Sequence, residues 1–419
     1  MNTTEVRIGV MGTLRGASYV EIFTKLEGAR VTAVCENNPK SLEKIQKYID
    51  EEHIQVFTNY DEFIASGLFD GVLLANYFFE HVPFAIKAME HGVHVLSECT
   101  PALTMAECVE LCRAVERTGC KYMLAENYPF FACNLEMKRL YDSGKLGRAL
   151  YCEGEYNHPV SSHDKNMLSP GRLHWRNWLP RTYYITHALA PLMHITGDIP
   201  KSVNAKCVFA PDSLRGTACR VGDLAAIMLC EMRDGSLARI TGCSAWGGHG
   251  NWYRICGEKG NVENVRGSLE QIRVQFNGWQ IPEGEEEVNI RDAKWFDAEK
   301  LNAIASEATH GGGDFWVAYF FRKYLLDEYE PFFNVYRAVT MSAVAVLALR
   351  SSQNGGKEYQ IPDFTKEEDR LLWEHDTDSP FPDENGHATM ACCSHPDYMP
   401  TEEDFAQAEK EWKEAGLID

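Results

Sequence analysis

The first third of this 419-residue chain alternates short apolar runs with amphipathic stretches. The apolar runs predict strands at 6–11, 31–35, 71–75, 93–97 and 121–125, and helical periodicity predicts helices at 19–26, 39–49, 81–91 and 106–117. Strand and helix in regular alternation are typical of βαβ crossovers, so we expect a doubly wound parallel sheet covered on both faces. Ligands of such sheets lie at the carboxyl ends of the strands, which makes the segments after each strand candidate binding loops.

From Arg148 the pattern changes to longer strands with alternating hydrophobicity. These runs cover 149–156, 202–209, 225–232, 237–243 and 254–257, and the segment 233–236, Arg-Asp-Gly-Ser, is typical of a hairpin turn. We therefore expect a second, α+β domain built on an open antiparallel sheet. Helical patterns return at 315–326 and 336–351, and we expect them to pack near the junction of the two domains.

These patterns divide the chain into three segments. Residues 1–147 are the predicted dinucleotide-binding domain, and 148–365 the predicted domain for substrate binding and oligomerisation. Residues 366–419 form a polar C-terminal extension that ends in a helix near 402–415.

Composition limits the classes of partner. The chain has 41 basic and 61 acidic side chains, a net charge of −20 that repels nucleic-acid backbones and anionic membrane surfaces. We therefore expect neither as a partner. The N-terminal residues lack a basic segment followed by a long apolar stretch, and 341–349 is far shorter than the ~20 residues that span a bilayer, so we expect a cytoplasmic protein. The 14 cysteines include no Cys-x-x-Cys pair and are expected to be reduced thiols.

A turn that suits a dinucleotide follows the first strand. Gly12 and Gly16 flank it, and the helix that opens there can offer the backbone amides near Leu14 and Arg15 to a pyrophosphate. The full Gly-x-Gly-x-x-Gly spacing is absent. Glu36, at the end of the second strand, supports the interpretation because a carboxylate there accepts both ribose hydroxyls and repels a 2′-phosphate. The sequence thus favours NAD over NADP; a flavodoxin-like sheet with another ligand is the alternative.

The later segments resemble the Gfo/Idh/MocA oxidoreductases. The resemblance rests on Gly71-Val-Leu-Leu-Ala-Asn-Tyr-Phe-Phe-Glu-His81, on Val93-His-Val-Leu-Ser-Glu-Cys-Thr-Pro101 and on Ser143-Gly-Lys-Leu-Gly147. It implies an N-terminal Rossmann domain followed by a sheet-rich domain, with a polyol or sugar as substrate. It also implies that NAD contacts lie in the loops after the strands, at Asn37, Asn76, His81, Glu98 and Asn127.

One departure from this family concerns the proton transfer. Ordinary members carry Glu-Lys-Pro after the fifth strand, where the lysine acts as acid and base, but this chain has Glu98-Cys99-Thr100-Pro101. Neither a thiol nor a threonine hydroxyl replaces an ammonium that exchanges a proton near neutral pH. Another residue must do so, or the simple dehydrogenase interpretation is wrong.

Further motifs resemble the NAD-dependent glycosidases of this family, of the α-N-acetylgalactosaminidase type. They are Tyr122-Met-Leu-Ala-Glu-Asn127, Glu153-Gly-Glu-Tyr-Asn-His158, Trp175-Arg176, Tyr184-Ile-Thr-His187 and His310-Gly-Gly-Gly-Asp314. Such enzymes are similar in lacking the lysine. The resemblance implies a tightly bound NAD that oxidises sugar C3 transiently, elimination at C1 through loss of the C2 proton, addition of water and reduction of the ketone.

The resemblance also implies the residues of the sugar site. Tyr184, His187, Tyr156, Arg176 and Glu126 match motif positions that line it. Tyr184 and His187 are one helical turn apart and can face one cleft. We expect His187 to act as acid and base at C3, Tyr156 or Tyr184 to take the C2 proton, and Arg176 to hold substrate or enolate.

Other side chains near these motifs are candidates for the same site. His158 shares a strand face with Tyr156, and Trp246 lies in a loop between two strands where its ring could stack on a sugar. Glu155, His158, His163, Asp164 and His187 offer nitrogen and oxygen ligands for a divalent metal, but no strong ligand spacing is present, so a metal is left open and not predicted.

Three functions are consistent with the sequence. The first is hydrolysis or elimination of a glycoside through a 3-keto intermediate. The second is a net NAD-dependent dehydrogenase of sugars or polyols, and the third is a non-catalytic cofactor-binding regulator. We expect a neutral carbohydrate as ligand, with which the acidic net charge is compatible, and a homo-oligomer formed through the sheet of the second domain.

Overall fold

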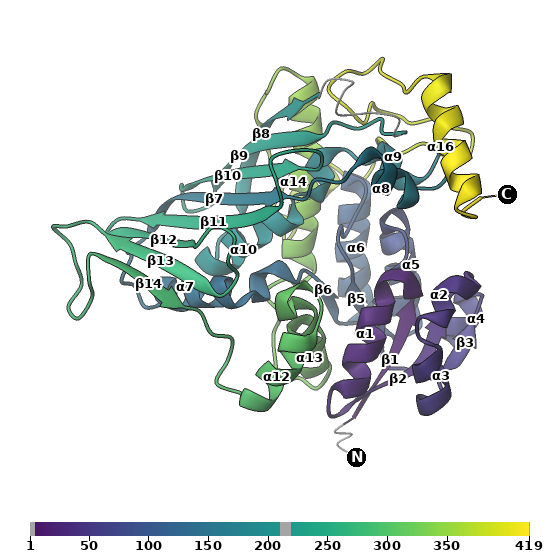
Figure 1. Cartoon of the computed structure of the whole chain (residues 1–419), viewed down its shortest axis with the longest axis horizontal. Helices are drawn as coiled ribbons and strands as arrows, with labels where there is room; N and C mark the ends of the chain where they lie inside the picture. The colour runs from purple at the N-terminus through teal and green to yellow at the C-terminus, as the bar shows by residue number, and fades with distance from the viewer. Residues whose placement is uncertain (1–4, 210–218, 419) are drawn as a thin grey trace. The chain divides into compact units, whose positions relative to one another are not determined.

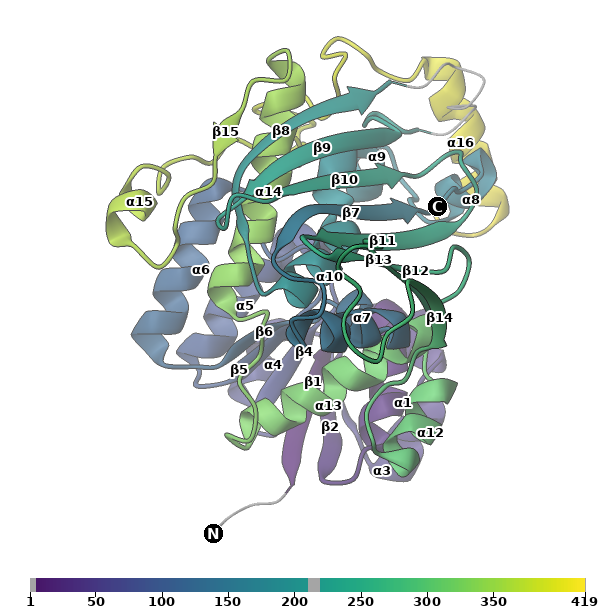
Figure 2. The same ribbon diagram turned by 90° about the vertical axis from the view of Figure 1, so that its left-hand side faces the viewer.

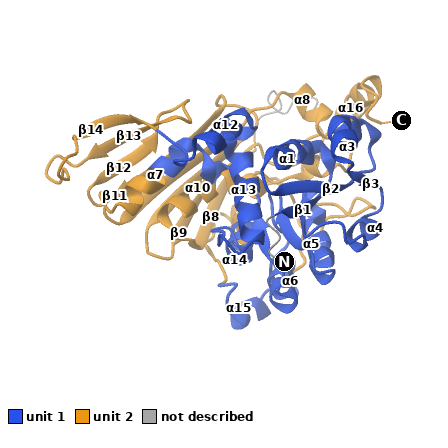
Figure 3. Cartoon of the chain, turned by 90° about the horizontal axis from the view of Figure 1, so that it is seen from below, with its two compact units in different colours: residues 1–136, 293–342, 363–375 blue, residues 137–292, 343–362, 376–419 orange. Residues whose placement is uncertain are grey.

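The computed structural model describes residues 5–209 and 219–418. They form two compact units, each made of several segments of the chain (Figure 3). The first contains residues 1–136, 293–342 and 363–375, and the second contains 137–292, 343–362 and 376–419. The assignment of functions to the segments 1–147, 148–365 and 366–419 stays a prediction.

The first unit is built on the parallel sheet that the alternating pattern predicts. Its six strands are ordered β3-β2-β1-β4-β5-β6, and every pairing is parallel (Figure 1). The strands are β1 (Val6–Met11), β2 (Ala29–Cys35), β3 (Gln55–Phe57), β4 (Gly71–Leu74), β5 (His94–Ser97) and β6 (Tyr122–Leu124). The strand order changes direction next to β1, and this is where a doubly wound sheet binds its ligand.

Helices connect and cover these strands. The elements are α1 (Thr13–Lys25), α2 (Pro39–Glu43), α3 (Gln46–Glu52), α4 (Tyr60–Ala65), η1 (Phe78–Glu80), α5 (His81–Glu90), α6 (Met105–Thr118) and η2 (Tyr128–Phe130). The sequence pattern predicted neither β3 nor α4. The three residues of β3 are largely exposed and form no apolar run. It also predicted one helix at 39–49, whereas the chain forms two, since the buried Ile45 leaves the helical conformation (φ −115°, ψ 8°).

The segment 293–342 completes the core of this unit. It carries α12 (Glu299–Glu307), η4 (His310–Gly312) and α13 (Gly313–Leu325). Phe315, Trp316 and Phe321 of α13 are almost fully buried in the same apolar cluster as Ile8 of β1 and Phe23 of α1. Burying aromatic side chains of this size against the sheet is a large stabilising contribution.

The second unit is built on a nine-stranded sheet of order β14-β13-β12-β11-β7-β10-β9-β8-β15 (Figure 2). Its pairings are antiparallel except that of β7 with β10, which is parallel. The strands are β7 (Ala149–Asn157), β8 (Pro200–Val208), β9 (Ala225–Met232), β10 (Leu237–Cys243), β11 (Gly250–Gly257), β12 (Gly260–Asn264), β13 (Gln271–Phe276), β14 (Val288–Asp292) and β15 (Tyr359–Gln360). The predicted hairpin joins β9 to β10.

Helix α10 (Thr186–Thr196) covers one face of this sheet against β7, β10 and β11. Its backbone approaches β7 so closely that a Cβ at Gly154 would lie 2.0 Å from the carbonyl oxygen of Ala188. Only glycine fits there, and the close packing fixes the side chains that follow on both elements. The shorter elements of this unit are α8 (Ser162–Met167), α9 (Trp175–Trp178) and η3 (Arg181–Tyr184).

The C-terminal extension is divided between the units, because 366–375 belong to the first and the residues from 376 onward to the second. The predicted terminal helix is α16 (Glu402–Glu414), which begins with a capping box between Thr401 and Asp404. Trp412 is fully buried, and its indole Nε1 donates to the carbonyl oxygen of Asn166, 2.8 Å away, at α8. The remaining elements are α7 (Ala132–Asp142), α14 (Val335–Gln353) and α15 (Glu367–Leu371).

Within the part of the chain that the structure describes, no helix is both long enough and apolar enough to cross a lipid bilayer.

Candidate functional site

The turn after β1 has the geometry that a pyrophosphate site needs. Gly12 is the N-cap of α1 at φ +83°, and a Cβ there would lie 2.7 Å from the carbonyl oxygen of Ala75. No other residue fits this backbone without a shift. The first amides of any helix lack intrahelical partners, so the amides around the exposed Leu14 and Arg15 are available to an anion. Gly16 packs in the first turn of the same helix.

Glu36 follows β2, as predicted. Its carboxylate accepts hydrogen bonds from the start of α1 and from the loop after β2. One oxygen accepts from the amide and hydroxyl of Thr13, at 2.8 and 3.0 Å, and the other from the amides of Asn37 and Asn38, each at 2.9 Å. These four donors use the acceptor sites of the carboxylate. Glu36 is thus positioned next to the glycine turn.

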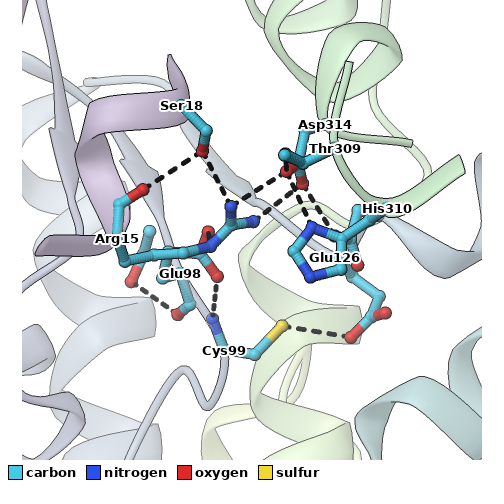
Figure 4. A network of polar contacts seen from close by, with 10 residues as sticks. Arg15, Ser18, Glu98, Cys99, Glu126, Thr309, His310 and Asp314 are labelled. Atoms are coloured by element: carbon cyan, nitrogen blue, oxygen red, sulfur yellow. Dashed lines mark hydrogen bonds and ion pairs between the residues drawn. The ribbon is translucent and has the colours of Figure 1, made fainter. Parts of the chain in front are cut away.

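Arg15 belongs to a buried polar network that is shown in Figure 4. Its guanidinium bonds both oxygens of Asp314, at 2.9 and 2.7 Å, and pairs with Glu98 at 2.9 Å. Asp314, in the His310-Gly-Gly-Gly-Asp314 motif, is fully buried and also accepts from Asn127 (2.7 Å). Desolvation raises the pKa of Asp314, but bonds from His310 and Arg15 outweigh it and hold that pKa well below its usual range. The network joins α1, α13 and the loops after β5 and β6.

His81 and Asn76 make local contacts in the loop after β4. The His81 ring is buried, and its Nδ1 lies 3.0 Å from the carbonyl oxygen of Thr100. Burial lowers the pKa of His81 to about 4, so the ring is neutral at physiological pH. The Asn76 amide donates to Glu80 at 3.0 Å. His81 therefore supports the loop that carries Glu98 and has no proton to exchange near pH 7.

A thiol and a carboxylate meet where the family lysine is missing. The Cys99 thiol donates to Glu126 at 3.0 Å (Figure 4), and Glu126 also accepts from the amide of Tyr128 at 3.3 Å. Glu126 is fully buried in the first unit, whereas the other predicted sugar contacts, Arg176, His158 and Trp246, belong to the second.

Three rings of the predicted sugar site come together in the second unit. The centroid of the Tyr156 ring lies 5.0 Å from that of His187 and 5.7 Å from that of Tyr184, and the last two are 5.4 Å apart. Tyr156 comes from β7, Tyr184 from η3 and His187 from α10. The Tyr253 hydroxyl of β11 donates to the backbone carbonyl oxygen of His187 at 2.7 Å, and this bond connects β11 with α10. The grouping that the sequence motifs predicted is therefore present in the fold.

A buried cation that the sequence motifs did not indicate lies beneath the two tyrosine rings. The guanidinium carbon of Arg181 lies 5.3 Å from the Tyr156 centroid and 5.5 Å from the Tyr184 centroid, and the side chain is 6% exposed. One of its nitrogens donates to the carbonyl oxygen of Tyr156 at 3.4 Å. The sequence shows an arginine three residues before Tyr184. This spacing alone does not indicate whether the side chain is buried or exposed to solvent.

The two tyrosines open into a cavity of about 250 Å³. Apart from the tyrosines, its polar lining consists of His158, Lys165, Arg176, Arg181, Arg220, Asp223 and Ser244. His187 lies outside this lining and touches it through both tyrosine rings. Trp246, half-buried between β10 and β11, is also outside it. Lys165, Arg220 and Asp223 were not predicted from the sequence.

His158 directly follows the last residue of β7, and the centroid of its ring lies 4.8 Å from that of His249. Desolvation lowers the pKa of His158, and the nearby His249, Arg181 and His187 act in the same direction. Its ring is therefore neutral near pH 7 and is able to accept a proton.

The described residues contain no group of three or more His, Cys, Asp or Glu side chains arranged to hold a metal ion. Two of the possible ligands have other partners: Glu155 accepts from Asn157 at 2.7 Å, and His163 lies 3.5 Å from Glu411.

Three family models match the chain. The NAD-binding Rossmann fold of the Gfo/Idh/MocA oxidoreductase family matches residues 6–126, and the Gfo/Idh/MocA C-terminal domain matches 134–263. The C-terminal domain of glycosyl hydrolase 109 matches residues 252–370.

Curated relatives align along most of the chain. Glycosyl hydrolase family 109 protein 1 of Shewanella sp. (strain ANA-3) is 26% identical over 412 residues, covering 89% of this chain and 87% of the relative. The α-N-acetylgalactosaminidase of Shewanella oneidensis is 26% identical over 410 residues, covering 88% and 86%. Among solved structures, a levoglucosan dehydrogenase in complex with NADH and L-sorbose matches with a TM-score of 0.70 at 16% identity, covering 86% of this chain and all of that one.

Proposed function

Because the chain belongs to the Gfo/Idh/MocA oxidoreductase family, we propose that it is an NAD-dependent enzyme that cleaves glycosides through a 3-keto sugar. The observation that carries the proposal is the grouping of Tyr156, Tyr184 and His187 above the buried guanidinium of Arg181. Two phenol groups and an imidazole can transfer protons, and the positive charge beside them can stabilise an enolate.

The names of the relatives support the same interpretation. Glycosyl hydrolase 109 proteins align along nearly the whole chain, and one is named an α-N-acetylgalactosaminidase. The absence of lysine at Cys99 also favours a route in which proton transfer is done by residues of the second unit.

NAD, when bound, supplies reversible hydride transfer with the sugar. The glycine turn at Gly12 and the carboxylate of Glu36 are the groups that would hold its pyrophosphate and its adenosine ribose. The negative charge of Glu36 favours NAD over NADP, because a 2′-phosphate would be repelled there.

The other steps are assigned to the chain's own side chains. His187 takes the proton of the C3 hydroxyl, and Tyr156 or Tyr184 takes the C2 proton that the ketone has made acidic. Arg181 stabilises the negative charge of the resulting enolate, whose collapse expels the C1 substituent, and Arg176 holds the substrate. Addition of water at C1, return of the hydride to C3 and the reverse proton transfers would complete a hydrolysis that leaves the nicotinamide in its starting state.

Aryl glycosides test the proposal directly. Incubation of the holoenzyme with nitrophenyl glycosides should release nitrophenol without stoichiometric accumulation of NADH, followed at the same time by absorbance. Stoichiometric NADH with an intact glycosidic bond would instead establish the net dehydrogenase. Bound NAD without turnover of any glycoside or polyol would favour the non-catalytic regulator.

Substitution of His187 tests whether this residue is the acid and base at the C3 hydroxyl. His187→Ala should abolish turnover while leaving NAD bound, since the imidazole belongs to the second unit and the NAD residues to the first. The exposed His387→Ala is the matched control and should turn over normally. Full activity of His187→Ala would refute the assignment.

We also propose that the chain forms a homo-oligomer through the sheet face opposite α10. Ile227 and Leu229 of β9 and Leu237 of β10 expose 49%, 40% and 41% of their surface on the strands' outward side. An apolar stripe of this kind on an open sheet is typical of a contact surface. Light scattering should give a multimer for the unmodified protein and a smaller species for Ile227→Glu; Leu372→Glu, at a residue 77% exposed in the first unit, is the control.

A further inference from the structure

The cavity beside Tyr156 and Tyr184 is strongly basic. Lys165, Arg176, Arg181 and Arg220 line it, and among the described lining residues one carboxylate, that of Asp223, opposes them. These cations come from separate segments: Lys165 lies in α8, Arg176 in α9 and Arg181 in η3, and Arg220 precedes β9. Their convergence is therefore a property of the fold and not of one charged stretch of sequence.

The one carboxylate of this lining already has strong partners. Asp223 accepts from the amide and from the hydroxyl of Ser394, each at 2.7 Å. Both contacts come from the C-terminal extension. The carboxylate therefore holds that extension in place.

The cations act on one another. Desolvation lowers the pKa of Lys165 well below its usual value, and the charges of Arg220, Arg176 and Arg181 lower it further. Like charges gathered in a partly enclosed space favour the binding of an anion, because the anion reduces their mutual repulsion. The local charge also contrasts with the chain as a whole, whose net charge is −20.

The size of the cavity limits the anion. A volume of about 250 Å³ is below the range typical of drug-sized ligands, so one substituted sugar ring is a better match than an oligosaccharide. Arg181 is the cation nearest the tyrosine rings. The Lys165 ammonium donates to the backbone carbonyl oxygen of Arg176, a bond that connects α8 with α9.

We propose that the substrate is an anionic sugar, whose carboxylate, sulfate or phosphate group is held by Lys165, Arg176 and Arg220. The inference rests on the proposed function, because it places the sugar ring beside Tyr156 and Tyr184 in the same cavity. Guanidinium and ammonium groups share their preference for oxyanions, and planar guanidinium groups bind them in bidentate fashion. It differs from the sequence-based expectation of a neutral sugar.

Binding measurements test this inference without requiring turnover. Calorimetry on the NAD-loaded protein compares galactose with galacturonate, galactose 6-sulfate and galactose 6-phosphate. At least one anionic sugar should bind about tenfold or more tightly than galactose, the equivalent of one charge-assisted hydrogen bond. The tightest of the three identifies the anionic group. Equal affinity for the neutral sugar and all three anions would overturn the inference.

Two substitutions assign the preference to the cavity. Arg220→Gln and Lys165→Gln should each reduce the affinity ratio between the best anionic sugar and galactose toward one. Arg239→Gln is the matched control, because Arg239 lies on β10 and pairs with Glu153 outside the cavity. A ratio that survives both cavity substitutions, or falls equally in the control, would show that the anion binds elsewhere and overturn the inference.

Turnover separates this inference from the proposed function. Nitrophenyl glycosides of the same four sugars are assayed with the intact holoenzyme. Cleavage with no advantage for an anionic sugar would support the function and overturn the inference. Tight binding of an anionic sugar that depends on Arg220, without cleavage of any glycoside, would support the ligand class and overturn the glycosidase.

Discussion

The guanidinium carbon of Arg181 lies 5.3 Å from the centroid of the Tyr156 ring, and the arginine also bonds the backbone carbonyl of that tyrosine. A buried cation thus lies beneath a ring assigned to proton transfer. The contact connects η3 with β7, so the position of the charge depends on the packing of two elements and not on local sequence.

The first prediction concerns this charge. Arg181→Gln should lower kcat by about a hundredfold, the usual cost of removing one preorganised group that stabilises a developing negative charge. Arg181→Lys should recover part of the loss because it keeps the charge. Initial rates with nitrophenyl glycosides measure both, and thermal unfolding checks that the variants are folded. A lysine variant no better than glutamine would point to a structural role for the guanidinium.

The second prediction concerns the glycine turn. Gly12→Ala should weaken NAD binding by more than about tenfold, because the new Cβ meets the Ala75 carbonyl oxygen and shifts the turn away from its anion-binding geometry. Gly67→Ala is the matched control: Gly67 also has a positive φ, of +67°, but has open space around it. Fluorescence titration with NADH measures the affinity. Equal losses in the two variants would attribute the effect to backbone strain alone.

The third prediction concerns pH. Burial lowers the pKa of His194 in α10 to about 3, compared with about 6.5 for histidine in an unfolded chain. Between these values the unfolded chain binds a proton that the folded protein does not. The free energy of unfolding therefore falls as pH decreases below about 6.5, by up to about 1.4 kcal/mol per pH unit from this residue.

Urea unfolding measured between about pH 7.5 and pH 5 checks the sign and size of this effect. His194→Gln should give a shallower fall over the same range, whereas the exposed His387→Gln should retain the slope of the unmodified protein. An unchanged slope in His194→Gln would contradict the assignment.

The fourth prediction concerns the C-terminal extension. Trp412→Ala should loosen α16 from α8, since it removes a fully buried indole and its bond to the Asn166 carbonyl. Because α8 carries Lys165, substrate affinity should fall as well. Hydrogen exchange should increase in 162–167 and 402–414, and KM should rise. Trp279→Ala, at a tryptophan that is 81% exposed, is the control and should change neither.

Several features of the fold were predictable because they follow from local patterns. The strands of the first unit, apart from β3, lie where the apolar runs predicted them, and the hairpin between β9 and β10 follows from its turn residues. The terminal helix α16 was likewise predicted, at the end of the polar extension near 402–415. The short β3 was missed, because its three residues derive their strand conformation from pairing with β2 and not from their own pattern.

The sequence by itself determined the order of elements, the glycine turn with Glu36 and the missing lysine, because each depends on residue type and spacing. Only the tertiary structure decided that Arg15 pairs with Asp314, 299 residues away, and that Cys99 donates to Glu126. It also decided that four cations from separate segments line one cavity in an acidic chain. The physical reason is that contacts across long sequence separations are fixed by how sheets and helices pack, and no local pattern encodes which side chains then meet.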